Sequence, residues 1–243
     1  MRPDLVVDRA VERSFGGHAA DLDVDFAAVD RPALVTTLLA SCSNADATTW
    51  WGSSVGARTA GLLRLVMLTG EHADADAAAG ALRPSLRCPH CSDRIEAELP
   101  LAELVALEPA ERAIAFGPYR LRRPTGADLR TMRTEGESVW LQAWRAESGL
   151  PAVQTDAALI ALAQADPLVG FELTCRCPAC GEAATIEVDL EALALQRLAA
   201  QQRRLLREVH ALATQYGWSE AQILNLPAAR RTRYLELIEG LAA

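Results

Sequence analysis

The chain has 243 residues, enough to bury a hydrophobic core, and half of them are hydrophobic, which excludes a disordered protein. Aromatic residues make up only 5% while alanine and leucine are abundant, a composition that favours helices over an all-β fold. The formal net charge of −8 argues against a surface built as a whole to bind phosphate backbones, which leaves only local basic patches for that purpose.

No N-terminal stretch combines basic residues, a long apolar run and a small-residue cleavage site, and no window holds the roughly 18 apolar residues of a membrane span. We therefore expect a soluble, cytoplasmic protein. In a reducing compartment, closely spaced cysteines hold a metal ion more often than they form structural disulfides. The cysteine pairs of this chain are consequently candidate metal ligands.

The N-terminal third predicts helices and one short strand. Acidic and apolar residues alternate over 21–26, which predicts a half-buried strand, and the apolar run over 32–42 predicts a buried helix with a proline in its first turn. A further helix is expected over 57–69, ended by Gly70. The loop 52–56 before it lacks the Gly-Lys-Ser/Thr ending of a phosphate-binding loop, so we interpret it as a simple connection.

The middle of the chain is predicted to be mainly helical. We expect helices over 101–107, 137–146 and 156–164. The stretch 117–129 predicts a strand and then a turn in which Thr125 or Asp128 caps a helix. The basic residues of this strand are interpreted as one solvated face: Arg120, Arg122 and Arg123.

The longest helical pattern of the chain covers 190–216, with leucines repeating at heptad spacing, and Gly217 is expected to end it. Ser219 and Gln222 have the spacing of a capping box and predict a short helix. A last helix is expected after Pro227. Together these helices predict a C-terminal arm or small bundle.

Two Cys-Pro-x-Cys knuckles look like copies of one another: Arg87-Cys88-Pro89-His90-Cys91 and Arg176-Cys177-Pro178-Ala179-Cys180. Each precedes a strand of alternating acidic and apolar residues, and we align Ile95 of the first strand with Ile186 of the second. A structural zinc ion needs four ligands in a tetrahedron, and each Cys-x-x-Cys turn supplies two thiolates. We predict one shared structural Zn²⁺ with four ligands: Cys88, Cys91, Cys177 and Cys180.

Two other interpretations of these cysteines stay open, namely two redox-active pairs and packed thiols without a metal. The redox interpretation is the weaker because redox Cys-x-x-Cys motifs usually begin a helix, whereas these knuckles precede strands. Cys175 or His90 could replace a predicted ligand, although Cys175 aligns with the apolar Leu86 and is interpreted as packed. Cys42 is expected to be a small buried hydrophobic residue.

The predicted fold class is α+β and predominantly helical, with a small zinc-ribbon-like β core made by the two knuckle hairpins. We expect three regions: a mainly helical region over 1–85, a zinc-knuckle core over 86–190 with a helical insertion at about 101–170, and a C-terminal helical arm over 191–243. Four histidines, none of them in a recognisable catalytic constellation, and the lack of a nucleotide-binding motif argue against an enzyme.

The second knuckle and the C-terminal segments resemble the T4-like phage baseplate protein family. The similarity covers roughly residues 86–243, and its most specific part is the C-terminal tail. The segments that carry it are Arg176-Cys177-Pro178-Ala179-Cys180-Gly181, Ile186-Glu187-Val188-Asp189-Leu190, Arg123-Pro124-Thr125-Gly126-Ala127-Asp128, Val209-His210-Ala211-Leu212-Ala213, Tyr216-Gly217-Trp218-Ser219-Glu220, Ile223-Leu224 and Arg230-Arg231-Thr232-Arg233-Tyr234-Leu235-Glu236-Leu237.

The resemblance implies a structural or chaperone-like assembly role in the baseplate hub of a phage tail or a phage-like contractile injection system. Its partners would be other baseplate, hub or spike proteins, without a small-molecule substrate or a membrane, in the bacterial cytoplasm or in the particle itself. The alternative is a zinc-containing nucleic-acid-binding or regulatory protein that uses the arginines of the C-terminal helices: Arg203, Arg204, Arg207, Arg230, Arg231 and Arg233. The net negative charge and the acidic residues among these arginines argue against it.

Overall fold

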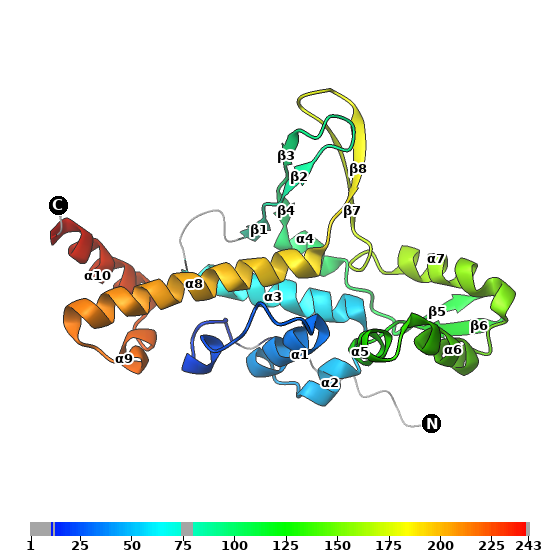
Figure 1. Ribbon diagram of the computed structural model, residues 1–243, viewed down its shortest axis with the longest axis horizontal. Coiled ribbons are helices and arrows are strands. Elements are labelled where there is room, and N and C mark those ends of the chain that lie inside the picture. Colours follow the sequence, from blue (N-terminus) through cyan, green and yellow to red (C-terminus); the bar gives the residue numbers. More distant parts are fainter. Residues whose placement is uncertain (1–10, 12, 74–79, 242–243) are drawn as a thin grey trace.

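The computed structural model describes residue 11, residues 13–73 and residues 80–241. The chain is a mixed α+β protein in which helices predominate and all described sheets are small and antiparallel. Figure 1 shows a helical body with two β-hairpins projecting from one side, a second helical group at one end and an arm at the other. None of the helices in the described part of the chain is both long and apolar enough to cross a membrane.

The N-terminal region contains the 3₁₀ helix η1 (Ala19–Asp21) and the α-helices α1 (Arg31–Cys42), α2 (Ala47–Trp51) and α3 (Val55–Ala73). The predicted helix at 32–42 is confirmed, but the predicted strand at 21–26 is wrong. Asp21 is buried there, accepts hydrogen bonds from the backbone N–H groups of Gly16 and His18, and pairs with Arg13. These side-chain contacts favour a turn over an extended strand.

Helix α3 continues through Gly70, where the sequence predicted its end. A glycine inside a helix costs only about 1 kcal/mol, so tertiary packing can carry the helix past it. At the other end, Gly56 has no room for a side chain because the Asp166 carboxylate lies where its Cβ would be. This contact joins the first turn of α3 to the end of the middle region.

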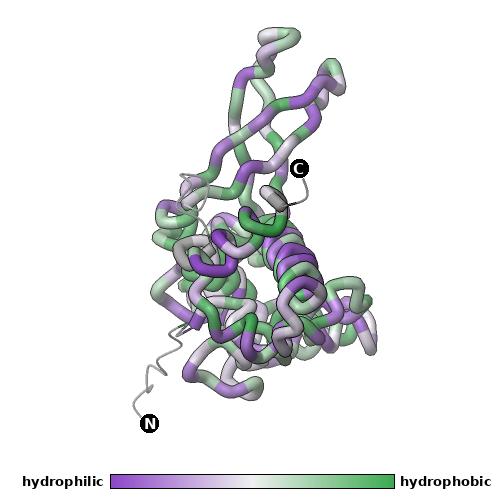
Figure 2. Tube along the Cα trace, turned by 90° about the vertical axis from the view of Figure 1, so that its left-hand side faces the viewer, coloured by the Kyte–Doolittle hydropathy of each residue, from purple (hydrophilic) through white to green (hydrophobic). Residues whose placement is uncertain are grey.

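The two projecting hairpins have matching architectures (Figure 1). Strand β1 (Ala81–Leu82) pairs with β4 (Leu99–Pro100), and β2 (Ser85–Arg87) pairs with β3 (Arg94–Glu96), in the first hairpin. In the second hairpin, β7 (Glu172–Arg176) pairs with β8 (Ala183–Glu187) over five residues. Figure 2 shows the pair standing clear of the helices, with hydrophilic and hydrophobic residues mixed along both.

The middle region contains helices α4 (Leu101–Ala106), α5 (Gly126–Thr134), α6 (Glu137–Ser148) and α7 (Thr155–Ala165), the 3₁₀ helix η3 (Ala152–Gln154), and strands β5 (Ala113–Phe116) and β6 (Tyr119–Arg122). The β5–β6 hairpin includes one strand that the sequence analysis did not predict. Thr125 and Asp128 form the expected cap of α5, each accepting a hydrogen bond from the backbone N–H of the other. This region has a core of its own, made by Leu121, Trp140, Trp144, Leu150, Ala158 and Leu162.

The three arginines near β6 do not form one solvated face as predicted. Arg122 pairs with Asp128 and Glu147, and Arg123 is 6% exposed and lies 3.5 Å from the Asp166 carboxylate. Only Arg120 is exposed. The prediction failed because these acidic partners come from three different places in the chain, which the local pattern could not reveal.

The C-terminal helices follow the prediction closely: α8 (Leu190–Tyr216), α9 (Glu220–Leu224) and α10 (Ala228–Leu241). Gly217 ends α8 in the left-handed conformation, with φ +67°, and Ser219 and Gln222 form the predicted capping box. Helix α8 rises about 1.5 Å per residue and so extends over about 40 Å. Its first half lies on the body and its second half supports α9 and α10 (Figure 1).

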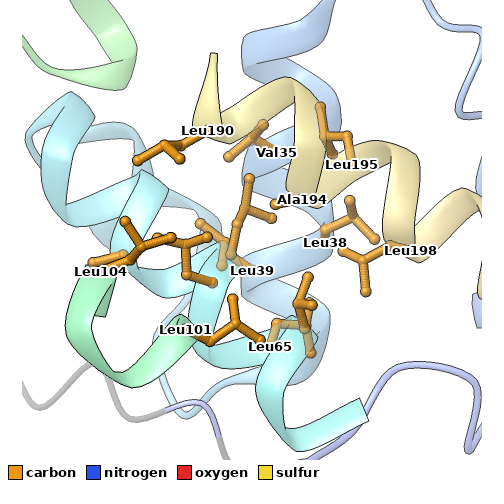
Figure 3. Packing of buried hydrophobic residues seen from close by; sticks show 14 of the residues in the cluster. Val35, Leu38, Leu39, Leu65, Leu101, Leu104, Leu190, Ala194, Leu195 and Leu198 are labelled. Carbon is orange, nitrogen blue, oxygen red and sulfur yellow. The ribbon is translucent and has the colours of Figure 1, made fainter. Parts of the chain in front are cut away.

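The main hydrophobic core lies between α1, α3, α4 and the first half of α8. Figure 3 shows apolar side chains from all four helices converging, and its labelled residues are Val35, Leu38, Leu39, Leu65, Leu101, Leu104, Leu190, Ala194, Leu195 and Leu198. Trp50 of α2 is also buried in this core and donates a hydrogen bond to Ser43. Both helices that follow the hairpins therefore pack into a single core, which fixes the bases of the hairpins relative to each other.

Candidate metal centre

Each knuckle is a tight turn closed by two backbone hydrogen bonds. In the first, the N–H of Cys88 donates to Asp93 O and the N–H of Ser92 donates to Cys88 O, both at 2.9 Å. In the second, the N–H of Cys177 donates to Glu182 O and the N–H of Gly181 donates to Cys177 O, again both at 2.9 Å. The two turns thus have the same hydrogen-bond pattern at positions 89 residues apart.

The left-handed residue of each turn also occupies the same place. Ser92 has φ +63° and Gly181 has φ +75°. Glycine adopts this conformation without steric cost, whereas serine does not. The geometry of the turn is therefore kept even where the sequence is less favourable for it.

The 89-residue offset extends beyond the knuckles to the helices that follow. Leu101 begins α4 and Leu190 begins α8. The cross-strand pair of Leu82 and Leu99 corresponds to the backbone hydrogen bond between Val188 and Phe171. The two units, residues 82–101 and 171–190, are called the first and second hairpin units below.

This register corrects our alignment of the strands. We matched Ile95 with Ile186, but the structure places Ile95 opposite Leu86 and the equivalent Ala184 opposite Cys175. A slip of two residues keeps every side chain on the same face of a strand, so an alternating pattern alone cannot detect it. Ile95 and Ala184 are both buried, as equivalent positions should be.

The structure brings the four predicted cysteines of the two knuckles together, and their Sγ atoms all lie within 4.8 Å of one another. Contacts run between the hairpins: Cys88 Sγ lies 3.8 Å from Cys180 Sγ, and Cys91 Sγ lies 3.7 Å from Cys177 Sγ. A tetrahedral ion with metal–sulfur bonds of about 2.3 Å separates its sulfur ligands by about 3.8 Å. The four thiols therefore have the spacing of a site that could hold a metal ion.

A disulfide interpretation does not fit these distances, because a disulfide joins its sulfur atoms at about 2.05 Å. All six cysteines are free thiols. The sulfur–sulfur contacts of 3.7 and 3.8 Å also join one hairpin to the other and not the two cysteines of one Cys-x-x-Cys motif. A metal ion at this position would join segments that lie 86 to 92 residues apart in sequence.

The cluster is half buried. Cys88 and Cys177 are 2% and 1% exposed, whereas Cys91 and Cys180 face the surface. Beneath them lies a small apolar core formed by Cys88, Ile95 and Cys177 together with the partly buried Leu86, Cys175 and Ile186. This core positions the two inner thiols and leaves the outer two at the hairpin tips.

Cys177 and Cys91 lie in different electrostatic environments within the cluster. The backbone N–H groups of Cys180 and Ala179 stabilise the Cys177 thiolate and lower its pKa to about 7. The N–H of Asp93 favours the Cys91 thiolate, but desolvation and the neighbouring thiols outweigh it and raise the Cys91 pKa to about 12. Several thiolates cannot share this space without a cation, whereas a divalent ion would stabilise all of them.

The other candidate ligands lie outside the cluster. Cys175 points into the small apolar core beneath it, and His90 is exposed, with its Nε2 3.2 Å from the carbonyl oxygen of Ala183. Cys42 is buried in the main core, as predicted. Within the part of the chain that the structure describes, the four-cysteine group is the one cluster of His, Cys, Asp and Glu side chains able to hold a metal.

Sequence reasoning missed the arginine that precedes each knuckle. Arg87 Nη1 donates to Ser92 O at 3.3 Å, and Arg176 Nη1 donates to Gly181 O at 2.8 Å. The signal was present, because both knuckles begin with Arg-Cys. It could not be interpreted without the turn geometry, which places the acceptor carbonyl five residues later.

Four thiol ligands in this arrangement would complete a tetrahedral coordination sphere. A catalytic zinc site keeps one position open for water or substrate, and four protein ligands leave none. A closed sphere of this kind is typical of a structural zinc site and differs from a catalytic one. No family model, curated protein or solved structure matches the chain.

Proposed function

We propose that the chain is a structural or assembly protein of the baseplate of a phage tail or a phage-like contractile injection system, stabilised by a structural zinc ion. The observation that carries the proposal is the closed group of four thiols joining two hairpins that are far apart in sequence. A closed site supports a clamp and offers no chemistry to a substrate. The baseplate context comes from the resemblance of residues 86–243.

Zinc is the metal we propose because thiolate ligands in a tetrahedron are the usual structural zinc set. Iron can also be bound by four thiolates, so metal analysis has to distinguish the two. Zinc would supply the positive charge that lets all four thiolates coexist. Cys88, Cys91, Cys177 and Cys180 would hold it, and the apolar core beneath Cys88 and Cys177 would fix the geometry.

The C-terminal arm is the surface we propose for partner contacts. Its three aromatic rings pack on one another where α8, α9 and α10 meet: Tyr216 stacks on Trp218 at 4.8 Å, and Tyr234 lies edge-on to both, at 5.5 and 5.0 Å. All three rings are partly exposed, and Leu237 nearby on α10 is 57% exposed. Aromatic and arginine side chains are enriched at protein interfaces.

The nucleic-acid alternative relies on six arginines of the arm, of which two are engaged internally. Arg231 is 9% exposed and binds Glu208, which also pairs with Arg204. The remaining four are exposed: Arg203, Arg207, Arg230 and Arg233. Four exposed arginines on a chain with a net charge of −8 are a weak basis for phosphate binding.

Metal analysis of the purified protein tests the clamp. We expect one zinc ion per chain, lost in Cys88→Ser and in Cys177→Ser and retained in Cys175→Ser, whose thiol lies beneath the cluster. Zinc content unchanged in both ligand variants would exclude the shared site. Iron in place of zinc would refute the metal assignment but keep the clamp.

Co-expression with the tube, spike, hub and wedge proteins of a contractile system tests the role. We expect the tagged chain to retain at least one of them, and Arg230→Glu with Arg233→Glu on the exposed side of α10 to weaken the capture. Arg120→Glu, an exposed arginine on β6, is the matched control. No capture of any of these proteins, together with steeply salt-dependent binding to DNA, would refute the assembly role and support the alternative.

A further inference from the structure

Each knuckle carries a side-chain bond that closes its turn from outside. Arg87 lies in β2 immediately before Cys88, and its guanidinium donates to Ser92 O, just past Cys91. Arg176 lies in β7 immediately before Cys177, and its guanidinium donates to Gly181 O, just past Cys180. In both cases the bond spans the two ligands of one knuckle.

The acceptor in both bonds is the carbonyl oxygen of the one residue in each hairpin with a left-handed backbone. The carbonyl of that residue is free to accept the guanidinium because the backbone hydrogen bonds of the turn use its N–H, not its oxygen. Two occurrences of the same bond at the 89-residue offset make an accidental surface contact a poor explanation. Arg94 is another exposed arginine of the first hairpin, but the described residue 89 positions later is Ala183, so no arginine bond is repeated there.

We propose that Arg87 and Arg176 are positioning residues that lock the two knuckles around the metal and slow its release. The inference rests on the proposed structural metal. Release of the ion requires the thiolate ligands to move away from it, and a bond from the strand before a knuckle to the residue after it resists that movement. Groups that surround metal ligands hold them in their binding geometry in this way.

The two bonds are not equal. Arg176 Nη1 lies 2.8 Å from its acceptor, a normal hydrogen bond, whereas the Arg87 contact of 3.3 Å is long. Loss of the Arg176 bond should therefore speed zinc release more than loss of the Arg87 bond. Groups around metal ligands typically change metal affinity by about 10- to 100-fold when they are removed. Exposed bonds such as these should act at or below the lower end of that range, and we expect zinc release to be faster by about 10-fold without the Arg176 bond and by about 3-fold without the Arg87 bond.

The test measures transfer of the bound zinc from the full-length protein to the coloured chelator 4-(2-pyridylazo)resorcinol. Arg87→Met and Arg176→Met keep an unbranched apolar stem but remove the charge and the donor, and both should release zinc faster. Arg176→Lys keeps the charge and one donor, so it should recover part of the wild-type rate. Arg83→Met is the matched control, because Arg83 pairs with Glu98 near the base of the first hairpin, away from the turn that carries Cys88 and Cys91.

Two further measurements separate positioning from a general loss of stability. The cobalt-substituted variants should keep the thiolate-to-cobalt charge-transfer bands of a four-thiolate site, and the melting temperature of the metal-free protein should stay as in wild type. Release rates unchanged in both methionine variants of a metal-bound protein would refute the lock alone. A wild-type protein that holds no metal would refute the structural zinc and the lock together.

Discussion

The first and second hairpin units share one geometry but differ in how well their own sequences support it. Both have the same turn, the same preceding arginine and a helix that begins at the same position, Leu101 or Leu190. The second unit pairs five residues between its strands and continues into a helix of 27 residues. The first pairs three residues in β2–β3 and two more in β1–β4, with a break between the two ladders, and continues into a helix of six.

These differences between the hairpin units indicate how far each unit relies on contacts outside itself. Uninterrupted strand pairing, a glycine in the left-handed position and a side-chain cap all support the second unit locally. The first has a serine in that position and a proline at the helix N-cap, which provides no side-chain hydrogen bond. We infer that the second unit is formed by its own interactions and that the first is held chiefly by the shared core and by the proposed metal ion.

Removal of the metal should have the largest effect on this comparison. Apparent free energies of structural zinc binding reach about 10–16 kcal/mol in small zinc-binding peptides. After chelation, the N–H groups of Cys88 and Ser92 should exchange with solvent faster than those of Cys177 and Gly181, because the strand pairing behind the first turn is interrupted after three residues. Hydrogen–deuterium exchange with and without metal measures which of the two turns loses more protection. Equal loss of protection in both turns would contradict the inferred dependence.

The second-largest effect is expected from the leucines that begin the two helices. Leu101 and Leu190 are 0% and 1% exposed, and both point into the main core (Figure 3). Replacing either by alanine should lower the free energy of unfolding by about 2–5 kcal/mol, since each substitution leaves a cavity. Urea unfolding measures both. Leu107→Ala, at a position 38% exposed just after α4, is the control and should change stability by less than about 1 kcal/mol.

The similarity of the two leucine variants is the informative outcome. If both units dock into one core, both losses should fall within the range of about 2–5 kcal/mol despite the different helix lengths. A small loss for Leu101→Ala with a large one for Leu190→Ala would mean that the first unit contributes little to the core.

The sequence predicted the local features of this fold well. Helix α8 was predicted with its observed ends because a glycine stop and a long apolar repeat are both local signals. The capping boxes at Thr125 and Ser219 are equally local. Four cysteines in two repeated knuckles were sufficient to predict the cluster, since the ligand set of a closed thiolate site is contained in the motif.

Features that depend on distant partners were not predictable in the same way. Arg123 was placed in solvent because its partner Asp166 comes 43 residues later, beyond any local pattern. Asp21 was assigned to a strand because alternation does not reveal that its side chain accepts backbone hydrogen bonds in a turn. Strand β5 is different, since Gly117 between it and β6, with φ +56°, was an available hairpin signal.

The N-cap of α8 provides a smaller test of the local support for the second unit. Asp189 accepts a hydrogen bond from the N–H of Ala192 and binds Arg31 through two nitrogens, at 2.8 and 2.5 Å. Asp189→Ala should lower the free energy of unfolding by about 1–2 kcal/mol at pH 7, the sum of a lost cap and a lost exposed ion pair.

The same residue gives a pH dependence with a defined sign. Hydrogen bonding to Arg31 holds the pKa of Asp189 below its ordinary value. A depressed carboxyl pKa stabilises the folded state fully above the unfolded value of about 3.9 and loses that contribution as the pH falls through the folded value. The stability difference between wild type and Asp189→Ala should therefore shrink below about pH 4, and a constant difference in urea titrations would contradict the assignment.

The left-handed residues give the smallest and most direct test of the comparison. Serine at φ +63° pays a steric cost that glycine avoids, so Ser92→Gly should stabilise the protein by up to about 1 kcal/mol, while Gly181→Ser should destabilise it by about the same amount. Both substitutions leave the backbone carbonyls that accept the arginine bonds. Thermal unfolding of the metal-bound protein measures the two changes, whose opposite signs make each variant the control of the other. If Ser92→Gly also slows the exchange of the first turn in the metal-free protein, the weakness of that unit lies in this backbone position; if exchange stays fast, its interrupted strand pairing is the cause.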